Sequence, residues 1–363
     1  MRVKLEDVCE RGSSNIKQSD IIKMSGNYPI YGASGLAGKV NFYHQEQPYV
    51  AVVKDGAGIG RTTLNPAKSS VIGTMQYLIP KKNVLPEYLF YVVSYMHLEK
   101  YYTGATIPHI YFKDYKNEEF NLDNIEKQLE IIDVLGRCKK VIEARKQELV
   151  ELDSLTKARF VELFGDPRSN PFGFEKKRLK DTCKVITGNT PSRAIAEYYG
   201  DYIEWIKTDN IVSGILNPTQ ATESLSEKGM NVGRTVEKDS ILMACIAGSI
   251  ASIGRVCITD RTVAFNQQIN AVVPEQYNIL ILYVLFQMSK DYLVEDINMA
   301  LKGILSKSKL EEKEFIIPPM DLQEQFSDFV KQVNKSKFDT MTFAPIYAII
   351  NLYLHTYFYQ GRR

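Results

Sequence analysis

Apolar residues recur at alternating three- and four-residue steps from Asp123 to Leu163, a stretch without proline. Charged residues fill most positions between them, so the apolar seam is narrow, as in a helix that pairs with another helix. Asp123 followed by Glu126 suits a helix start, and Gly165 to Pro167 suit its end. The pattern predicts one helix over 122–165, about 60 Å long; its charged flanks disfavour burial on all sides. Its pairing positions are Leu135, Ile142, Leu149, Leu152 and Leu163.

The segment before this helix has the pattern of a mixed domain with short strands. Tyr49 to Val53 and Val71 to Ile79 are rich in β-branched and aromatic residues, which predicts two strands. Leu85 to Lys100 has helical spacing after a proline start. A glycine-rich turn begins at Lys54, directly after the first of these strands. We expect residues 1–121 to form the first domain.

The segment after the helix repeats the same order of elements, which predicts a second domain over 166–319. The offset between matched residues is 174 at the first match and 197 at the last, so the second copy is longer. The matched stretches are Leu5–Cys9 with Leu179–Cys183, Tyr49–Val53 with Ser240–Cys245, Ile59–Arg61 with Ile253–Arg255, Leu85–Lys100 with Ile279–Lys290, and Phe120–Gln128 with Ile317–Gln325.

A second helix is predicted over 320–338, with Leu322, Phe326 and Val333 on one face. Because it leaves the second domain as the first helix leaves the first, we expect the two helices to run antiparallel. The heptad spacing fails after Phe338, and the tail over 339–363 contains Pro345 and many tyrosines. We interpret this arm as shortened, with its end replaced by a frameshift or recombination. Our hypothesis is that 346–359 folds back over the seam of the first helix.

Composition describes a folded protein but names no partner. The chain has 363 residues, 44% of them hydrophobic, which is enough for two domains. Its formal charge of +2 balances 45 basic against 43 acidic residues, so overall basicity does not point to nucleic acid. Five cysteines without C-x-x-C spacing disfavour a disulfide framework or a zinc site. The start of the chain is charged and no apolar run is long enough to span a bilayer, so we expect a cytoplasmic protein without a membrane partner.

The order of domain, helix, domain and helix resembles the specificity subunit of type I restriction-modification systems. The resemblance covers about residues 1–338. It rests on the repeated strand, turn and Ile-Gly-Arg elements, the run Phe265–Gln268, the start of the second helix at Ile316–Gln325 and the end of the first at Leu163–Pro167. The implied fold class is α+β, with two tandem mixed α/β target-recognition domains alternating with two long antiparallel coiled-coil helices.

The resemblance implies that each domain reads one half of a bipartite site in double-stranded DNA, with the helices as a ruler between the halves. The helices are also expected to dock modification (methyltransferase) subunits and restriction subunits. Catalysis and the cofactors S-adenosylmethionine, ATP and Mg are then expected in those partners, and none bound by this chain. The sequence agrees, since it lacks a methyltransferase Asn-Pro-Pro-aromatic motif and a phosphate-binding loop.

Candidate DNA-binding residues in the first domain lie in two segments whose side chains can donate to bases or phosphates. The alternative for the glycine-rich turn is an ordinary hairpin turn, and a lone histidine such as His109 is more often structural. The candidates are Lys54, Arg61, Thr62 and Thr63 in the turn, and Thr106, His109, Tyr111 and Lys113 further along.

Candidates in the second domain form three groups. The amides near Phe265 can pair with adenine, and their alternative role is a structural hydrogen-bond network. The basic, hydroxyl-rich stretch suits phosphates, and its alternative is an ordinary solvated face. Arg255 shares a repeat position with Arg61, which favours a common backbone role. The groups are Lys207, Thr208 and Asn210 beside the single tryptophan; Arg255, Asn266, Gln267 and Gln268; and Lys302, Ser306, Lys307 and Lys309.

Three other functions stay open. A free-standing two-domain DNA-binding regulator would need no enzymatic partner, and a specificity subunit could be silenced by its altered C-terminus. An enzyme built from a duplicated β domain would need a carboxylate pair or metal cluster, and the four histidines lack H-x-H or H-x-x-x-H spacing. Co-purification of a methyltransferase subunit would distinguish the specificity subunit from the free-standing regulator. The metal content would test the enzyme.

Overall fold

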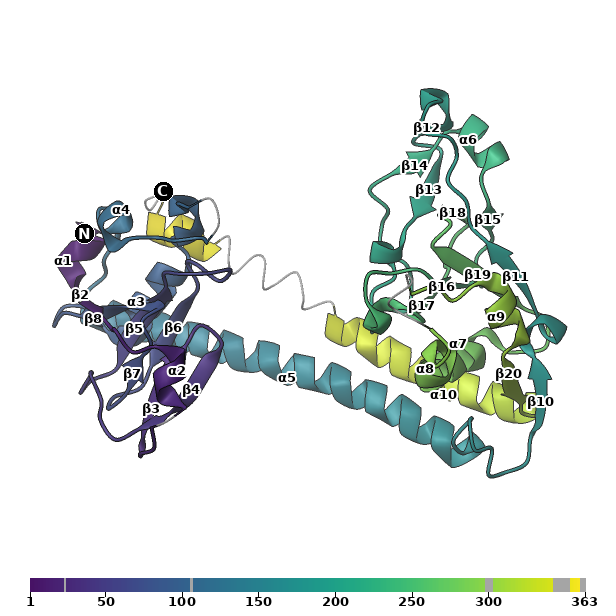
Figure 1. Ribbon diagram of the computed structural model, residues 1–363, viewed down its shortest axis with the longest axis horizontal. Helices are drawn as coiled ribbons and strands as arrows, with labels where there is room; N and C mark the ends of the chain where they lie inside the picture. Colours follow the sequence, from purple (N-terminus) through teal and green to yellow (C-terminus); the bar gives the residue numbers. More distant parts are fainter. Residues whose placement is uncertain (23, 105–106, 298–302, 342–352, 360–363) are drawn as a thin grey trace. The chain divides into compact units, whose positions relative to one another are not determined.

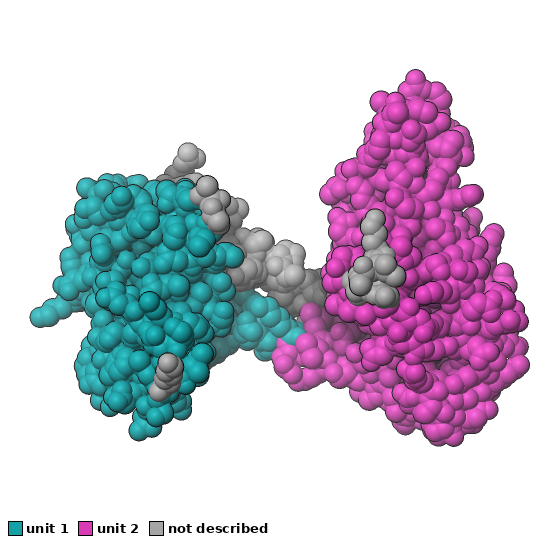
Figure 2. Space-filling view, in the orientation of Figure 1, with its two compact units in different colours: residues 1–146, 341–363 teal, residues 147–340 magenta. Residues whose placement is uncertain are grey.

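The computed structural model describes residues 1–22, 24–104, 107–297, 303–341 and 353–359, without the side chains of 338–341. The chain forms two compact units (Figure 2). Unit 1 contains residues 1–146 and 341–363, and unit 2 contains residues 147–340. The C-terminal tail therefore belongs with the first unit. Helix α5, Ile125–Phe164, contributes to both units.

Unit 1 is built on three small sheets (Figure 1). A four-stranded antiparallel sheet has the order β2-β8-β5-β6, a second has the order β4-β3-β7, and β1 pairs with β9. Tyr49 to Val53 of β5 are all buried, because β5 is a central strand with neighbours on both sides. The strands are β1 Arg2–Lys4, β2 Cys9–Ser13, β3 Tyr28–Gly32, β4 Gly35–Val40, β5 Tyr49–Val53, β6 Thr62–Asn65, β7 Ser70–Val71, β8 Met75–Pro80 and β9 Glu119–Asn121.

Helices of unit 1 cover one face of the four-stranded sheet, where α3 shares a hydrophobic core with β5 and α5. The predicted helix over Leu85 to Lys100 is too long. It ends at Ser94, because His97 has a left-handed φ of 52° and a short 3₁₀ turn follows. The helices are α1 Leu5–Val8, α2 Gln18–Ile21, α3 Pro86–Ser94 and α4 Phe112–Tyr115.

The strand predicted from Val71 to Ile79 is also wrong in detail. It divides into β7 and β8, because the backbone N–H of Ile72 donates to Tyr31 and that of Gly73 donates to Ile16. These two hydrogen bonds direct the chain away from the ladder before Met75 joins the four-stranded sheet.

Unit 2 repeats the sheet plan of unit 1 (Figure 1). Its four-stranded sheet has the order β11-β19-β16-β17, the longer second sheet has the order β12-β14-β13-β18-β15, and β10 pairs with β20. The strands are β10 Glu175–Arg178, β11 Cys183–Thr187, β12 Tyr199–Gly200, β13 Ile203–Ile206, β14 Ser224–Leu225, β15 Thr235–Val236, β16 Ile241–Ala244, β17 Val256–Ile258, β18 Val263–Phe265, β19 Ile269–Pro274 and β20 Glu314–Ile317.

Helix α7 is buried over most of its surface, and it packs with α5 and α10 in the main core of unit 2. The end of α5 and the start of α10 pair antiparallel there. Phe160 meets Phe326 at 5.6 Å between ring centroids, and Lys337 near the end of α10 donates a hydrogen bond to Asp153. The expected fold class is thus confirmed. The helices are α6 Glu227–Val232, α7 Ile279–Met288, α8 Lys290–Val294, α9 Lys307–Glu312 and α10 Met320–Met341.

A pair of buried glutamines corrects the alignment of the two repeats at the helix starts. The Gln128 side chain bonds to the backbones of Leu85 and Asp123, and Gln323 makes the same bonds to Asn278 and Pro318. Gln128 therefore matches Gln323, at an offset of 195, and not Gln325. The sequence prediction was wrong by two residues, because residues 124–128 resemble residues 321–325 in residue type, whereas the hydrogen bonds fix the match at 195.

The tail completes the second repeat. Helix α10 has 22 residues against 40 in α5, but residues 353–359 are helical again. Leu354 and Phe358 are buried in unit 1 as Phe160 and Phe164 are in unit 2. The tail thus packs beside α5 as hypothesised, while 342–352 lie outside the described residues. The prediction of a shortened second arm is therefore incomplete. Residues 353–359 form a further helical segment, and its buried residues Leu354 and Phe358 have the same i, i+4 spacing as Phe160 and Phe164 of α5.

Candidate nucleic-acid interface

The two candidate segments of unit 1 lie together. The backbone N–H of Ile110 donates to Lys54 and that of Gly56 donates to Pro108, both at 2.9 Å. The His109 ring contacts the Asp55 carboxylate at 2.6 Å between Nδ1 and Oδ1. The sequence separates these segments by about fifty residues, and the fold makes one surface of them.

Side chains on this surface divide into bound and available groups. Thr62 and Thr63 donate to the carbonyls of Gly60 and Ala51, and His109 is paired with Asp55, so these three have structural roles. Tyr111 and Lys113 are exposed, with the ammonium 5.4 Å from the ring centroid. Lys54 is half-buried and 3.8 Å from Asp55. Thr106 lies outside the described residues.

Glycines in the turn are required by its geometry. Gly60 has a φ of +81°, and a Cβ there would meet the backbone of Glu99 at 2.8 Å. The turn borders an open cavity of about 630 Å³ whose other wall is the β3–β4 hairpin. Arg61 lines this cavity and is exposed.

Unit 2 builds an equivalent surface with the same backbone bonds. Cys245 donates to the carbonyl of Gln268, and Leu305 donates to the carbonyl of Cys245. In unit 1, the backbone N–H of Lys54 likewise donates to the carbonyl of Thr74, and the carbonyl of Lys54 accepts from the backbone N–H of Ile110. The turn after β16, the loop before β19 and the start of α9 therefore meet.

The group beside Trp205 is mostly structural. Asn210 is buried and donates to Thr219 and Gln220, and the backbone carbonyl of Thr208 accepts from Arg255. Lys207 pairs with Glu223 at 2.9 Å. Hydrogen bonds from Lys207 and Arg193 lower the pKa of Glu223, so this carboxylate stays ionised and holds both cations.

The amide run divides in the same way. Asn266 is buried and bonds to the backbone and side chain of Gln268, so both belong to a structural network. Gln267 is exposed, and its carbonyl oxygen accepts a hydrogen bond from Thr190. Gln267 is the one amide of this run that faces solvent.

The basic stretch caps and extends helix α9. The Ser306 hydroxyl accepts from the backbone N–H of Lys309, as an N-cap does. Lys307 and Lys309 are exposed, although Lys307 lies 3.5 Å from Glu311 and Lys309 donates to the carbonyl of Asp296. Lys302 lies outside the described residues.

The helix-pairing positions lie in three environments. Leu163 and Leu322 pack at the edge of the unit 2 core, where Phe326 is buried and Val333 is also buried. Leu135 is buried in unit 1 beside the tail. The remaining three, Ile142, Leu149 and Leu152, are half-buried.

The sequence pattern did not predict several residues that hold unit 2 together. Phe160 and Phe164 are fully buried but belong to another ladder than the predicted seam. Arg193 lies over both Tyr199 and Trp205, at 4.3 and 5.1 Å from the ring centroids, and joins an insertion that unit 1 lacks. The single tryptophan was a usable signal for that cluster, because large aromatic rings often stack with arginine.

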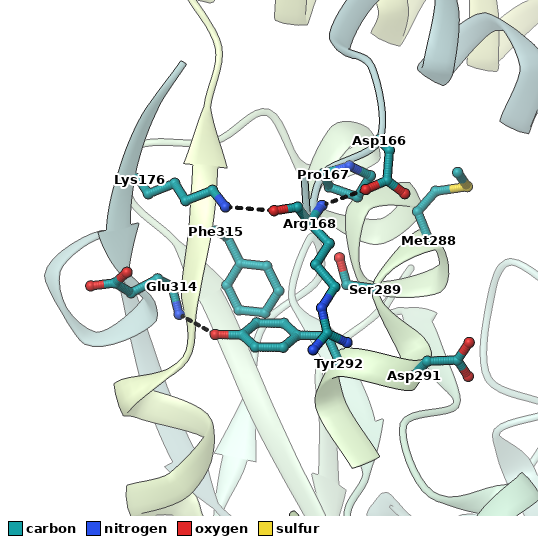
Figure 3. Close-up of a pocket in the computed structure, with 10 residues that line it drawn as sticks. All are labelled: Asp166, Pro167, Arg168, Lys176, Met288, Ser289, Asp291, Tyr292, Glu314 and Phe315. Atoms are coloured by element: carbon teal, nitrogen blue, oxygen red, sulfur yellow. Dashed lines mark hydrogen bonds between the residues drawn. The ribbon is translucent and has the colours of Figure 1, made fainter. Parts of the chain in front are cut away.

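A second cavity, of about 260 Å³, lies in unit 2 between the segment that follows α5, helix α8 and strand β20 (Figure 3). Two of its basic groups are engaged: Lys176 donates to the carbonyl of Arg168, and Arg168 pairs with Glu295. The Tyr292 hydroxyl accepts from the backbone of Glu314. These contacts secure the chain where it leaves α5, so we interpret the cavity as a structural joint.

The described part of the chain also bears on metal binding and membrane insertion. No group of three or more histidine, cysteine, aspartate or glutamate side chains there could hold a metal ion. Among those same residues, none of the helices combines the length and the apolar character needed to cross a bilayer.

The model of the type I restriction modification DNA specificity domain matches residues 1–153 and again 171–345. The chain is similar to the HindI type I restriction enzyme specificity subunit of Haemophilus influenzae, with 36% identity over 107 residues, 29% of this chain and 22% of that protein. It is 25% identical to the MjaIX specificity subunit of Methanocaldococcus jannaschii over 283 residues, 70% of this chain and 63% of that protein. The matched part is thus less than two thirds of either relative's length.

Solved structures share the fold. A type I restriction-modification S subunit from M. genitalium superposes with a TM-score of 0.64 at 14% identity, covering 98% of this chain and 95% of that one. A chain from a type I restriction-modification system, studied for its complex assembly and conformational transition, gives a TM-score of 0.53 at 15% identity, covering 98% and 97%. At this identity the likeness concerns the fold alone.

Proposed function

Because the chain belongs to the type I restriction modification DNA specificity family, which matches it in two segments, we propose that it is the DNA-reading subunit of such a system. Each unit reads one half of a bipartite site in double-stranded DNA. The observation that carries the proposal is the surface that both units build from the same three segments with the same backbone bonds. Loops held on a rigid sheet suit base reading, because their side chains project while their backbones stay fixed.

Available side chains on the two surfaces fit duplex DNA. Arg61, Tyr111 and Lys113 are exposed in unit 1, and Gln267, Lys307 and Lys309 in unit 2. Cations hold phosphates, and arginine or amide groups read base edges. We assign the other candidates that the structure describes to the support of these surfaces.

The helices carry the partners in this proposal. They dock modification subunits, which supply S-adenosylmethionine and methyl transfer, and restriction subunits, which supply ATP-dependent cleavage with Mg. This chain performs no chemistry itself and acts in the cytoplasm. The exposed apolar residues of α5, among them Val134, Val141 and Val150, support a docking role, because a pairing helix leaves such residues for a partner.

The test is co-expression of this chain with the modification subunit encoded beside it, followed by purification and methylation sequencing of host DNA. A bipartite methylated motif with a fixed gap is the expected result. A complex without methylation would indicate a silenced subunit. Sequence-specific DNA binding without any partner subunit would favour the free-standing regulator, and no binding at all would contradict both.

A further inference from the structure

Arg61 and Arg255 occupy the same place in the two repeats. In unit 1, Val53 donates to the carbonyl of Arg61 and accepts from Gly60, both at 2.9 Å. In unit 2, Ala244 donates to the carbonyl of Arg255 and accepts from Gly254, at 2.9 and 2.8 Å. Equivalent backbones would lead one to expect equivalent side chains.

The Arg255 side chain braces unit 2. Its guanidinium donates to the carbonyls of Ser252 and Thr208, each at 3.3 Å. Thr208 follows β13, which runs parallel to β18. Arg255 thereby ties its own turn to the neighbouring loop and is half-buried between them. Two of its five N–H donors are engaged in this way, and both hold the guanidinium within unit 2.

Unit 1 has no such brace. The corresponding loop follows β3, which runs parallel to β7, and consists of the small residues Ala33 and Ser34 before β4 begins at Gly35. The cavity of about 630 Å³ separates this loop from the turn. Among the described residues, nothing accepts a hydrogen bond from the Arg61 guanidinium or pairs with it.

Two details keep Arg61 available. Its guanidinium lies against Gly58, where a Cβ would meet the Arg61 Nη2, so a side chain at position 58 would require this flexible guanidinium to shift. The one carboxylate on the cavity wall, Asp55, already contacts His109 at 2.6 Å and Lys54 at 3.8 Å. Arg61 is therefore a cation with unused donors beside an open slot.

We infer that Arg61 contacts DNA through this slot, whereas Arg255, its repeat partner, does not. The inference rests on the proposed function and adds to it that the two units read DNA with different side chains. A guanidinium binds a pair of acceptors, which in DNA are either guanine O6 and N7 or phosphate oxygens. Asn15, Lys17 and Gln18 are exposed on the same rim, so the slot presents donors that the sequence pattern had not marked.

The experiment uses the full chain purified with its modification subunit, and a duplex carrying the methylated motif found for the wild type. Binding is measured by fluorescence anisotropy for Arg61→Ala, Arg61→Lys and Arg255→Ala, against the motif, single-base variants of each half and unrelated duplex. Thermal unfolding is recorded for every variant. Arg61→Ala is expected to weaken binding roughly 5- to 150-fold if it reads a base, with unfolding unchanged. Arg255→Ala is expected to lower the thermal stability.

The two sources of acceptors give different patterns. If Arg61 reads a guanine, Arg61→Lys also binds the motif weakly, and both variants lose the preference for one base pair in one half of the motif. For phosphate, Arg61→Lys keeps most of the affinity, and Arg61→Ala weakens all duplexes and reduces the salt slope by about 0.9. Wild-type binding by Arg61→Ala would overturn the inference while the proposed function stood. A wild-type complex without sequence preference would overturn the proposed function as well.

Discussion

Buried thiols occur in both units, and their burial disfavours ionisation. Burial raises the pKa of Cys9, Cys183, Cys245 and Cys257 to about 12. The thiolate is the reactive form, so these four side chains act as small apolar residues. Their spacing in the sequence disfavours a zinc site, but only the fold distinguishes them from Cys138, which is partly exposed on α5.

We therefore predict that one thiol reacts with an aromatic disulfide reagent in the native protein, and that Cys138→Ser abolishes this fast phase. All five should react after unfolding. Because the raised pKa values favour the neutral thiol in the folded state, stability should fall as pH rises from about 9 toward 12, where only the unfolded chain ionises. A second fast thiol in Cys138→Ser would contradict the burial of the other four.

Lysines on α9 give a second prediction at this scale. Lys307→Ala and Lys309→Ala should weaken binding to every duplex by similar factors and reduce the salt slope by about 0.9 each, as phosphate contacts do. Lys228→Ala is a matched control, because Lys228 of α6 is also an exposed lysine with one acidic partner, Glu197, and it lies outside the candidate segments. The measurement is affinity against salt concentration, and an unchanged slope would remove these lysines from the interface.

At the scale of elements, the sequence predicted what depends on local pattern. The 40 residues of α5 and the strand Tyr49–Val53 were visible because apolar period and strand composition are local properties. The division of β7 from β8 was not, because it depends on hydrogen bonds from Ile72 and Gly73 to distant carbonyls. The engaged and free arginines likewise share one motif, Ile-Gly-Arg, and differ only through loops far away in sequence.

The tail supplies a prediction for one element. Phe358 is fully buried, meets Tyr88 at 5.6 Å between ring centroids, and belongs to the core of unit 1. Phe358→Ala should lower the free energy of unfolding of unit 1 by about 3 to 5 kcal/mol. Tyr353→Ala, at a position 65% exposed, should change it by less than about 0.5 kcal/mol. Chemical denaturation followed by tyrosine fluorescence and circular dichroism measures both.

Further contacts make the tail a part of unit 1. The Asn121 side chain donates to the carbonyl of Tyr357, and the Tyr357 hydroxyl donates to Asp123, both at 3.0 Å. Equal unfolding curves for Phe358→Ala and wild type would mean that residues 353–359 are not held there in solution. The sequence pattern did not relate the tail to α5, because residues 353–359 share the spacing of two buried residues with α5 but lack the charged residues on its other faces.

At the scale of the whole molecule, each unit has its own hydrophobic core. The core residues of unit 1 and those of unit 2 form separate clusters, and neither Leu149 nor Leu152 of α5 belongs to any of them. These two half-buried leucines precede Asp153, which accepts a hydrogen bond from Lys337 of α10. The antiparallel helix pair can thus be disturbed without touching the cores that hold the proposed DNA-reading surfaces.

We predict that Leu149→Asp with Leu152→Asp uncouples DNA reading by the two units while both stay folded, because a carboxylate in an apolar seam opposes helix pairing. Binding to the complete bipartite duplex should fall toward that of a single half-site, since a fixed gap supplies the effective concentration for the second half. Ala158→Asp, at an exposed position of the same helix to which no docking role is assigned, is the control and should bind normally. Circular dichroism and anisotropy on whole and half-site duplexes measure this. Joint unfolding of both units would instead place the seam inside one shared core, and the ruler role of the helices would fail with it.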